Sequence, residues 1–229
     1  MRILLKLSGE ALAGDEKKGF SEPEVRKVTA QIKEIAKNNQ VSIVIGGGNF
    51  WRGRTCGEMD RAKADQIGML ATVMNCMYVS QILATEGVES EVFTPFVCST
   101  FTKQFSKEAA IKAMEEGKVV FFAGGTGHPF FSTDMGTVLR ALEVEAESVL
   151  LAKSIDGVYD SDPKLNPNAK KFDEISLKQV CEMGLKVVDT PASALALENN
   201  LPFLVFDLNE ENSIINAMSG KFNGTKVYV

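Results

Sequence analysis

The chain is organised around the stretch FFAGGTGHPFFSTD, which occupies residues 121–134. The apolar run at 119–122 is typical of a strand that is buried on both faces of a sheet. Glycines at 124, 125 and 127 then interrupt the strand and allow backbone N–H groups to approach a ligand closely. Ser132, Thr133 and Asp134 are suitable N-caps for a helix whose apolar positions begin at Met135. A strand, a glycine turn and a helix N-terminus in this order predict an anion site, although an ordinary strand–helix turn has the same order.

Composition and charge place the chain among globular proteins of moderate size. Its 229 residues, 45% of them hydrophobic, can bury a sizeable core as one large α/β domain or two small ones. The charge is 25 basic against 30 acidic residues, net -5 and without a block of like charges, which argues against a nucleic-acid surface. Cys56, Cys76, Cys98 and Cys181 lie far apart, so neither a zinc motif nor a disulfide framework is predicted. We expect a cytoplasmic protein that binds no membrane, since neither a signal peptide nor an apolar segment of about 20 residues is apparent.

Apolar runs alternate with helical patterns along the whole chain. Strands are predicted at residues 3–7, 41–45, 90–94, 119–122, 148–151 and 203–208, with an edge strand at 225–229. Helices are predicted from a capping box at 21–24 to residue 38, at 61–84, 107–116, from 135, at 177–182, from 189 and at 213–218. No repeat or linker divides residues 1–229, so we expect a single domain. The alternation predicts an α/β fold, a three-layer α/β/α sandwich around a mostly parallel twisted sheet.

Candidate binding features follow four of the predicted strands, at the sheet edge where parallel strands present ligands. Lys6 ends an inner strand, where a cation needs an anionic partner unless its side chain reaches the surface. Three consecutive glycines at 46–48 favour close approach to a phosphate over packing, because each glycine costs backbone entropy. Arg52 lies four residues further on, where its guanidinium can clamp phosphate oxygens. The central turn and the aspartate-rich loop at 153–163 complete the set, although Asx turns also explain that loop.

The longest predicted helix, residues 61–84, carries an apolar stripe that we expect to lie in the core. The stripe consists of Met69, Leu70, Val73, Met74, Met77 and Ile82. Asp65 near the start of this helix suits the helix dipole, or alternatively accepts hydrogen bonds from sugar hydroxyls. Trp51 is expected to pack against the protein rather than stack on a base.

Neither standard nucleotide motif is present. No GxxxxGK[ST] run occurs, and GxGxxG fails because Phe130 stands where the third glycine is required. The motifs that do occur are KLSGE at 6–10, IGGGN at 45–49 with Arg52, Asp65 with GMLAT at 68–72, GTGHPFFSTD at 125–134, and DGVY at 156–159. In this order and over the full chain they resemble the bacterial uridylate (UMP) kinases of the amino acid kinase superfamily. The GTGxPFFxTD string together with GMLAT is specific to this branch.

The resemblance implies the amino acid kinase fold and transfer of the ATP γ-phosphoryl group to UMP in pyrimidine nucleotide biosynthesis, which gives UDP and ADP. It implies catalytic roles for Lys6, Arg52 and Asp134, with Asp134 orienting Lys6. The implied ATP-binding residues are Lys6, Leu7, Ser8, Gly9, Gly48, Arg52 and, around the adenosine, Lys153, Tyr159 and Asp162. The implied UMP-binding residues are Gly47, Asp65 (at the ribose), Thr126, Gly127, His128, Pro129, Phe130, Phe131, Ser132 and Thr133. Mg²⁺ would be held through the nucleotide phosphates, and such kinases are usually allosteric hexamers activated by GTP and inhibited by UTP.

The sequence departs from the family pattern at several positions. His128 stands where asparagine is usual, and Ser132 stands where threonine is common. Lys153-Ser154 replaces a Thr-Lys or Thr-Asn pair, and the charged loop at 14–20 corresponds to an effector-binding stretch in some relatives. Because the acceptor that the resemblance implies is an ionised phosphate, the implied reaction would require no general base. We therefore expect His128 to be a contact or a spectator.

Two alternatives to UMP phosphorylation are a family member that phosphorylates a carboxylate or carbamate, and a non-catalytic nucleotide- or oxyanion-binding storage protein. The first would not need Asp65 or the segment 126–133. The presence of Lys6, Arg52 and Asp134 together speaks against the second.

Overall fold

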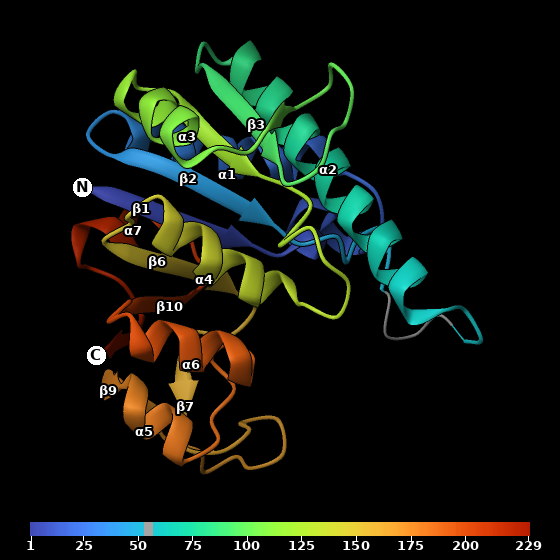
Figure 1. Ribbon diagram of the computed structural model, residues 1–229. Coiled ribbons are helices and arrows are strands. Elements are labelled where there is room, and N and C mark those ends of the chain that lie inside the picture. The colour runs from blue at the N-terminus through green and yellow to red at the C-terminus, as the bar shows by residue number, and fades with distance from the viewer. Residues whose placement is uncertain (53–56) are drawn as a thin grey trace.

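The computed structural model describes residues 1–52 and 57–229, so Cys56 lies outside the described residues. Within them, nine strands form one sheet in the order β4-β3-β5-β2-β1-β6-β10-β11-β9 (Figure 1). The strands are β1 Arg2–Leu7, β2 Gln40–Ile45, β3 Ser90–Thr94, β4 Lys103–Gln104, β5 Val119–Phe122, β6 Ser148–Lys153, β9 Glu174–Ser176, β10 Phe203–Asp207 and β11 Gly224–Tyr228. Neighbouring strands are parallel except β10 and β11. A separate antiparallel pair joins β7 (Val158–Tyr159) to β8 (Lys171–Phe172).

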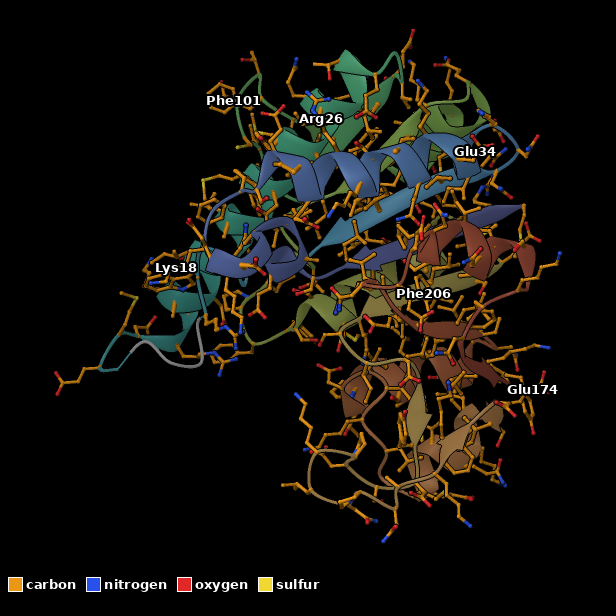
Figure 2. The ribbon with its side chains drawn as sticks, turned by 180° about the vertical axis from the view of Figure 1, so that it is seen from behind. Lys18, Arg26, Glu34, Phe101, Glu174 and Phe206 are labelled. Atoms are coloured by element: carbon orange, nitrogen blue, oxygen red, sulfur yellow. The ribbon has the colours of Figure 1, made fainter. Side chains whose placement is uncertain are left out.

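Helices cover both faces of this sheet. They are α1 Glu22–Ala36, α2 Arg61–Thr85, α3 Lys107–Glu115, α4 Thr133–Glu143, α5 Leu177–Glu182, α6 Thr190–Glu198 and α7 Ser213–Ser219, with short 3-10 helices η1 Gly9–Leu12 and η2 Gly14–Glu16. One core lies between the sheet and α3, α4, α5 and α6, and the other between the sheet and α1, α2 and α7, the face that Figure 2 presents. Along β1, Leu4 enters the first core while Ile3 and Leu5 enter the second. The predicted three-layer α/β/α sandwich is confirmed.

Strand β1 lies at the point where the chain changes direction across the sheet. Its two neighbours are β2 and β6, so that Lys6 is level with Val44 on one side and Leu151 on the other. Strands β5, β3 and β4 extend the sheet beyond β2, whereas β10 extends it beyond β6. Ligands of open parallel sheets bind at such a switch point, outside the carboxyl ends of the strands. The turns that follow β1 and β2 therefore meet at one edge.

Two local expectations are wrong. The last strand, β11, is not an edge strand, because β9 pairs with it in parallel on its outer side. Ser21 does precede α1, but its side chain makes no capping hydrogen bond, so the capping box predicted at 21–24 does not form. A complete capping box occurs instead at α5, where the side chains of Ser176 and Gln179 bond each other's backbone N–H groups.

The apolar stripe of α2 is only partly core. Val73 and Ile82 are buried, but Leu70 is 52% exposed and Met74 46% exposed, and Met77 is exposed as well. The N-terminal half of α2 extends past the carboxyl ends of the strands (Figure 1), and Met74 and Met77 in its C-terminal half lie on a side of the helix that is left exposed. Among the described helices, α2 alone is long and apolar enough to span a membrane by length and composition, contrary to the expectation from sequence. It packs along the sheet as a helix of the core, however, and 44% of its apolar 18-residue stretch is buried inside the protein.

Candidate active site

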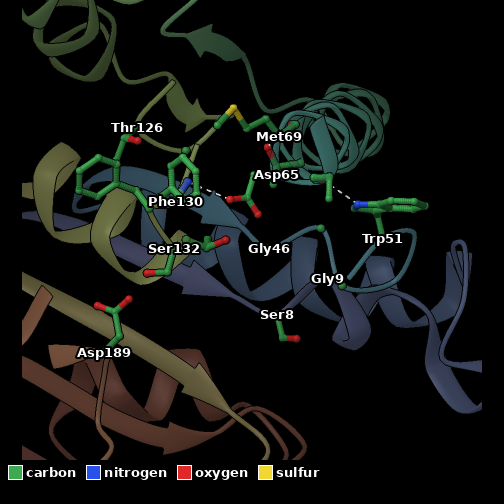
Figure 3. A pocket seen from close by; sticks show the side chains of 18 of the residues that line it. Ser8, Gly9, Gly46, Trp51, Asp65, Met69, Thr126, Phe130, Ser132 and Asp189 are labelled. Carbon is green, nitrogen blue, oxygen red and sulfur yellow. Dashed lines mark hydrogen bonds between the residues drawn. The ribbon is translucent and has the colours of Figure 1, made fainter. Parts of the chain in front are cut away.

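A cavity of about 340 Å³ opens at the carboxyl ends of the central strands (Figure 3). The strand-end turns and the segment after them line it with Lys6, Ser8, Gly9, Gly46, Gly47, Gly48 and Trp51. Helix α2 contributes Arg61, Ala64, Asp65, Gly68, Met69 and Thr72. The central segment contributes Gly125, Thr126, Phe130, Phe131, Ser132 and Thr133, and Asp189 lies opposite. Three of the four features predicted at strand ends therefore line a single cavity.

Lys6 forms an ion pair at the base of this cavity. Its Nζ lies 3.1 Å from Oδ1 of Asp134, and both side chains are largely buried. Asp134 is in the first turn of α4, whose N-cap Ser132 accepts a hydrogen bond from the N–H of Met135 at 3.0 Å. The cation at the end of an inner strand thus has the carboxylate partner that it requires. Because Ser132 and Thr133 line the cavity, the positive end of the α4 dipole faces it too.

The triple glycine serves packing as well as the cavity. A Cβ on Gly47 would stand 2.9 Å from both the Cβ of Ala71 and the carbonyl oxygen of Gly68. Only glycine allows the turn after β2 to lie this close to α2. Gly47 therefore has the packing role that the sequence interpretation set aside, and all three glycines also line the cavity; their approach to a phosphate stays a prediction.

Asp65 connects α2 to the central segment. Its Oδ2 accepts a hydrogen bond from the N–H of Phe130 at 2.8 Å, and Nε of Arg61 lies 3.0 and 2.9 Å from its two oxygens. Phe130 adopts the left-handed conformation, with φ of 73°, which is unfavourable for a residue with a side chain. The helix start is capped by Asp60 instead, which accepts from the N–H of Lys63. Asp65 therefore holds the central segment over the cavity rather than capping α2.

Several predicted residues lie at the rim or outside the cavity. Arg52 pairs with Glu10. Glu10 lies beside Gly48, because a Cβ added to that glycine would be 3.4 Å from Oε1 of Glu10. Leu7 has its side chain fully buried in the core, so only its main chain can face a nucleotide. Gly127, His128 and Pro129 form the outer part of the central turn. There, Oγ1 of Thr126 accepts a hydrogen bond from the N–H of His128 at 3.2 Å.

A second cavity, of about 700 Å³, contains the three residues assigned to the adenosine end, Lys153, Tyr159 and Asp162. The hydroxyl of Tyr159 donates to Asp156 at 2.7 Å. Asp162 accepts from the N–H of Lys164 at 2.9 Å, which is the Asx turn that the sequence suggested.

Lys153, at the end of β6, lines the second cavity and interacts electrostatically with the Lys6–Asp134 pair of the first. Its ammonium group donates to the carbonyl of Val187. Burial is the main cause that lowers the pKa of Lys153 to about 8; attraction to Asp134 opposes this shift, and repulsion from Lys6 adds to it. Lys6, Asp134 and Lys153 therefore act on one another at the same strand ends.

Some cavity residues were missed in the sequence. Arg61 was detectable from its i,i+4 spacing to Asp65, which suits an ion pair on a helix. In the sequence, Asp189 marked only the start of a helix, and it is the N-cap of α6. Because it follows no strand, nothing in the sequence indicated that it also lines the cavity. Thr72 belongs to the GMLAT motif, and its hydroxyl accepts from the N–H of Gly124 at 2.7 Å. The ring N–H of Trp51 donates to the carbonyl oxygen of Ala64 at 2.8 Å, so this side chain packs against α2 as expected.

Comparisons with known proteins identify the family. Residues 1–207 match the Amino acid kinase family. The chain is similar over its whole length to the UMP kinase of Ureaplasma parvum, with 38% identity, a TM-score of 0.96 and coverage of 100% of this chain and 99% of that one. The UMP kinase of Bacillus anthracis is 34% identical with a TM-score of 0.95 (99% and 95% covered), and the uridylate kinase of Archaeoglobus fulgidus is 25% identical with 0.77 (99% and 100%). The resemblance noted in the sequence is confirmed, and the chain belongs to the amino acid kinase family, among relatives of the bacterial UMP kinases.

Proposed function

We propose that this protein transfers the γ-phosphoryl group of ATP to UMP, which gives ADP and UDP. The observation that carries the proposal is the single cavity in which the Lys6–Asp134 pair, the glycine turns and the central segment meet. The second cavity beyond Lys153 provides space for the adenosine of the donor. The similarity of the full chain to the UMP kinases supports the same assignment.

In this mechanism the protein positions two anions and stabilises the charge that moves between them. Lys6, oriented by Asp134, neutralises charge on the transferred phosphoryl group, and Arg52 contacts donor phosphates at the rim beside Gly48. Backbone N–H groups of the two glycine turns and the N-terminus of α4 face the phosphates. Asp65 and the segment 126–133 hold UMP. The phosphate of UMP attacks directly, so no side chain has to remove a proton.

Mg²⁺ fits this site as a partner of the nucleotide. Among residues 1–52 and 57–229, no three His, Cys, Asp or Glu side chains gather into a metal site. We therefore propose that the ion is held by the nucleotide phosphates rather than by a cage of protein side chains. When bound, Mg²⁺ would neutralise charge on the phosphate oxygens, and Lys6 and Arg52 would add to that effect.

The test is a coupled assay of ADP release with ATP and Mg²⁺. UMP, CMP and dUMP are compared as acceptors with carbamate and acetylglutamate, each with and without GTP. Turnover with UMP at least about 100-fold above the carboxylate and carbamate acceptors is expected. Turnover with a carboxylate or carbamate alone would replace the proposal by the alternative kinase. Nucleotide binding without turnover on any acceptor would favour a storage protein.

His128→Asn should leave kcat and kcat/KM within about threefold of the wild type at every pH. The reason is that His128 lies at the outer part of the central turn, and an ionised acceptor needs no base. The pH profile of kcat/KM is the measurement. A large loss accompanied by a changed pH profile would mean that His128 acts as a base.

Lys153 should make ATP binding sensitive to alkaline pH. Its pKa of about 8 means that it loses its proton above that pH, and the phosphates of ATP favour the protonated form. The KM for ATP should therefore rise by about tenfold between about pH 7 and pH 9.5, and ATP binding near pH 8 should take up as much as about half a proton per chain. Titration calorimetry in buffers of different ionisation enthalpy measures that proton.

Lys153→Met should remove both effects, whereas Lys178→Met, a change of an exposed lysine on α5, should remove neither. An unchanged proton uptake in Lys153→Met would assign the titration to another group. The same depressed pKa implies that the unfolded chain binds more protons between about pH 8 and its ordinary value of 10.5, so this group's contribution to folding stability rises with pH there.

The exposed stripe of α2 supports a homo-oligomer, which we propose to be a hexamer. Its residues Ile67, Leu70, Met74 and Met77 recur at helical spacing on one face. Contiguous apolar surface of this kind marks protein–protein contacts. Sedimentation should give about six times the 24.9 kDa chain mass, and Leu70→Glu should lower it. A monomer in the wild type would contradict the proposal.

We also propose that the protein is located in the cytoplasm and acts in pyrimidine biosynthesis, and that GTP activates it or UTP inhibits it.

A further inference from the structure

A pair of buried amide side chains lies beneath the cavity. Asn49 directly follows the triple glycine and is 3% exposed, and Asn75 lies in the middle of α2 and is 0% exposed. Nδ2 of Asn49 donates to Oδ1 of Asn75 at 3.0 Å, and Nδ2 of Asn75 donates to Oδ1 of Asn49 at 2.8 Å. Polar side chains are buried at a cost unless they are hydrogen-bonded, and this pair satisfies itself reciprocally.

The remaining hydrogen bonds of the pair fix its orientation and reach two backbone segments. Nδ2 of Asn75 also donates to the carbonyl of Gly46 at 2.7 Å. Nδ2 of Asn49 also donates to the carbonyl of Gly19 at 2.8 Å. Only an N–H group can face a carbonyl oxygen, so both amides are held in one orientation. Asn75 thereby ties the cavity-lining turn after β2 to α2.

The turn after β1 rests on the same pair. A Cβ on Gly9 would stand 2.3 Å from the carbonyl oxygen of Gly46, 2.5 Å from Oδ1 of Asn49 and 2.9 Å from Nδ2 of Asn75. The backbone at Gly9 therefore lies directly against Gly46 and both amides. The turn after β1 and the turn after β2 are therefore in direct contact with each other along one side of the cavity.

We propose that Asn75 is a positioning residue for phosphoryl transfer, which sets the spacing between the turn after β1 and the turn after β2. It does not line the cavity, so it acts through Gly46 and Asn49. The inference rests on the proposed function, in which these two turns face the nucleotide phosphates. A displacement of about 1 Å in such a site costs roughly 10²-fold in rate even when the fold is intact.

Asn75→Asp is the most informative substitution, because it keeps the size and removes the N–H donors. The ionised carboxylate of this variant cannot donate to Gly46 and repels Oδ1 of Asn49, whereas the protonated carboxyl group has one O–H to donate. Burial raises the pKa of such a carboxyl group, so its protonated form is accessible at mildly acidic pH. Lys6, Glu10 and Cys76 are ionisable residues of the elements around Asn75, and they are the same in the wild type and the variant. The ratio of variant to wild type at each pH isolates the substituted position.

The expected result at about pH 8 is a loss of about 30-fold in kcat, with the KM for UMP within about threefold of the wild type. The ratio of kcat to the wild type should recover as the pH is lowered towards about 6. The matched control is Asn39→Asp, a part-buried amide that bonds the carbonyl of Ile35 at the end of α1, away from the cavity. It should stay within about twofold at every pH.

Three outcomes of the kinetic measurements would overturn the proposal. The first is kcat of Asn75→Asp within about twofold of the wild type at all pH values. The second is a pH-independent loss that matches the loss of folded protein measured by circular dichroism. If Asn75→Asp does not fold, Asn49→Ala is measured instead. This variant keeps the hydrogen bond from Asn75 to Gly46 and should lower kcat about fivefold. Full activity of Asn49→Ala is the third outcome that would overturn the proposal.

A further readout separates this inference from the proposed function. Calorimetric ATP binding requires no acceptor, so it can be measured even if the wild type does not phosphorylate UMP. Asn75→Asp should weaken ATP binding by about tenfold at about pH 8, and Asn39→Asp should not. Equal ATP affinity in the wild type and Asn75→Asp would reject the positioning role whatever the acceptor proves to be.

Discussion

Lys6→Ala should lower kcat by at least about 10²-fold while the KM values for ATP and UMP change by less than about fivefold. Lys6 is held at the base of the cavity by Asp134 at 3.1 Å, at the end of an inner strand, and so it is already placed for the phosphoryl group. A lysine about 4 Å from a phosphate oxygen, at an effective dielectric constant near 20, contributes about 4 kcal/mol. Since this attraction strengthens as charge moves in the transition state, its loss appears mainly in kcat.

The measurement for Lys6→Ala is steady-state kinetics with both substrates varied, together with circular dichroism to verify folding. Lys27→Ala is a suitable control, because Lys27 is an exposed lysine of α1 that pairs with Glu24 away from the cavity. It should leave both kinetic constants within about twofold. Unchanged turnover in Lys6→Ala would remove Lys6 from the mechanism.

Asp65→Asn should raise the KM for UMP by about 10- to 100-fold and leave the KM for ATP within about threefold. The substitution replaces one acceptor oxygen with an NH₂ group, so either the N–H of Phe130 or Arg61 loses its partner. The strained central segment then loses its tie to α2, and the sugar hydroxyls lose an ionised acceptor. Both losses fall on the acceptor nucleotide.

Asp60→Asn is the matched control for Asp65→Asn. Asp60 belongs to the same helix start and caps it through the N–H of Lys63, a role that asparagine performs equally well. Binding of UMP should be unaffected in this variant. An effect of Asp65→Asn on ATP alone would contradict the ribose assignment, and the two variants are distinguished by calorimetry with each nucleotide.

The parts of the fold that were predictable from sequence are those that local patterns specify. The run at 119–122 is apolar throughout because β5 is covered on both faces, and it was recognisable for that reason. The helix that follows was predicted two residues too late, since Thr133 and Asp134 belong to α4 rather than to its cap. Glycine turns after strands predicted the edge at which the cavity lies.

Other features could not be predicted because they depend on which segments meet. The apolar positions of α2 were all expected to lie in the core, but their spacing does not reveal which of them a neighbouring element covers. Leu70 and Met74 lie on a side of α2 that stays exposed. The pairing of β9 outside β11 joins segments far apart in the chain, so the last strand looked like an edge.

The amino-acid sequence by itself determined the alternation of strands and helices, the glycine turns at the strand ends and the family to which the chain belongs. These follow from the spacing of apolar residues and from motifs, which are properties of short stretches. The family resemblance already implied that Asp134 orients Lys6. Only the tertiary structure decided that Asp189 lines the cavity and that Asn49 and Asn75 form one buried pair. Each of these contacts joins separate elements, and its geometry depends on how the sheet and helices pack around a common core.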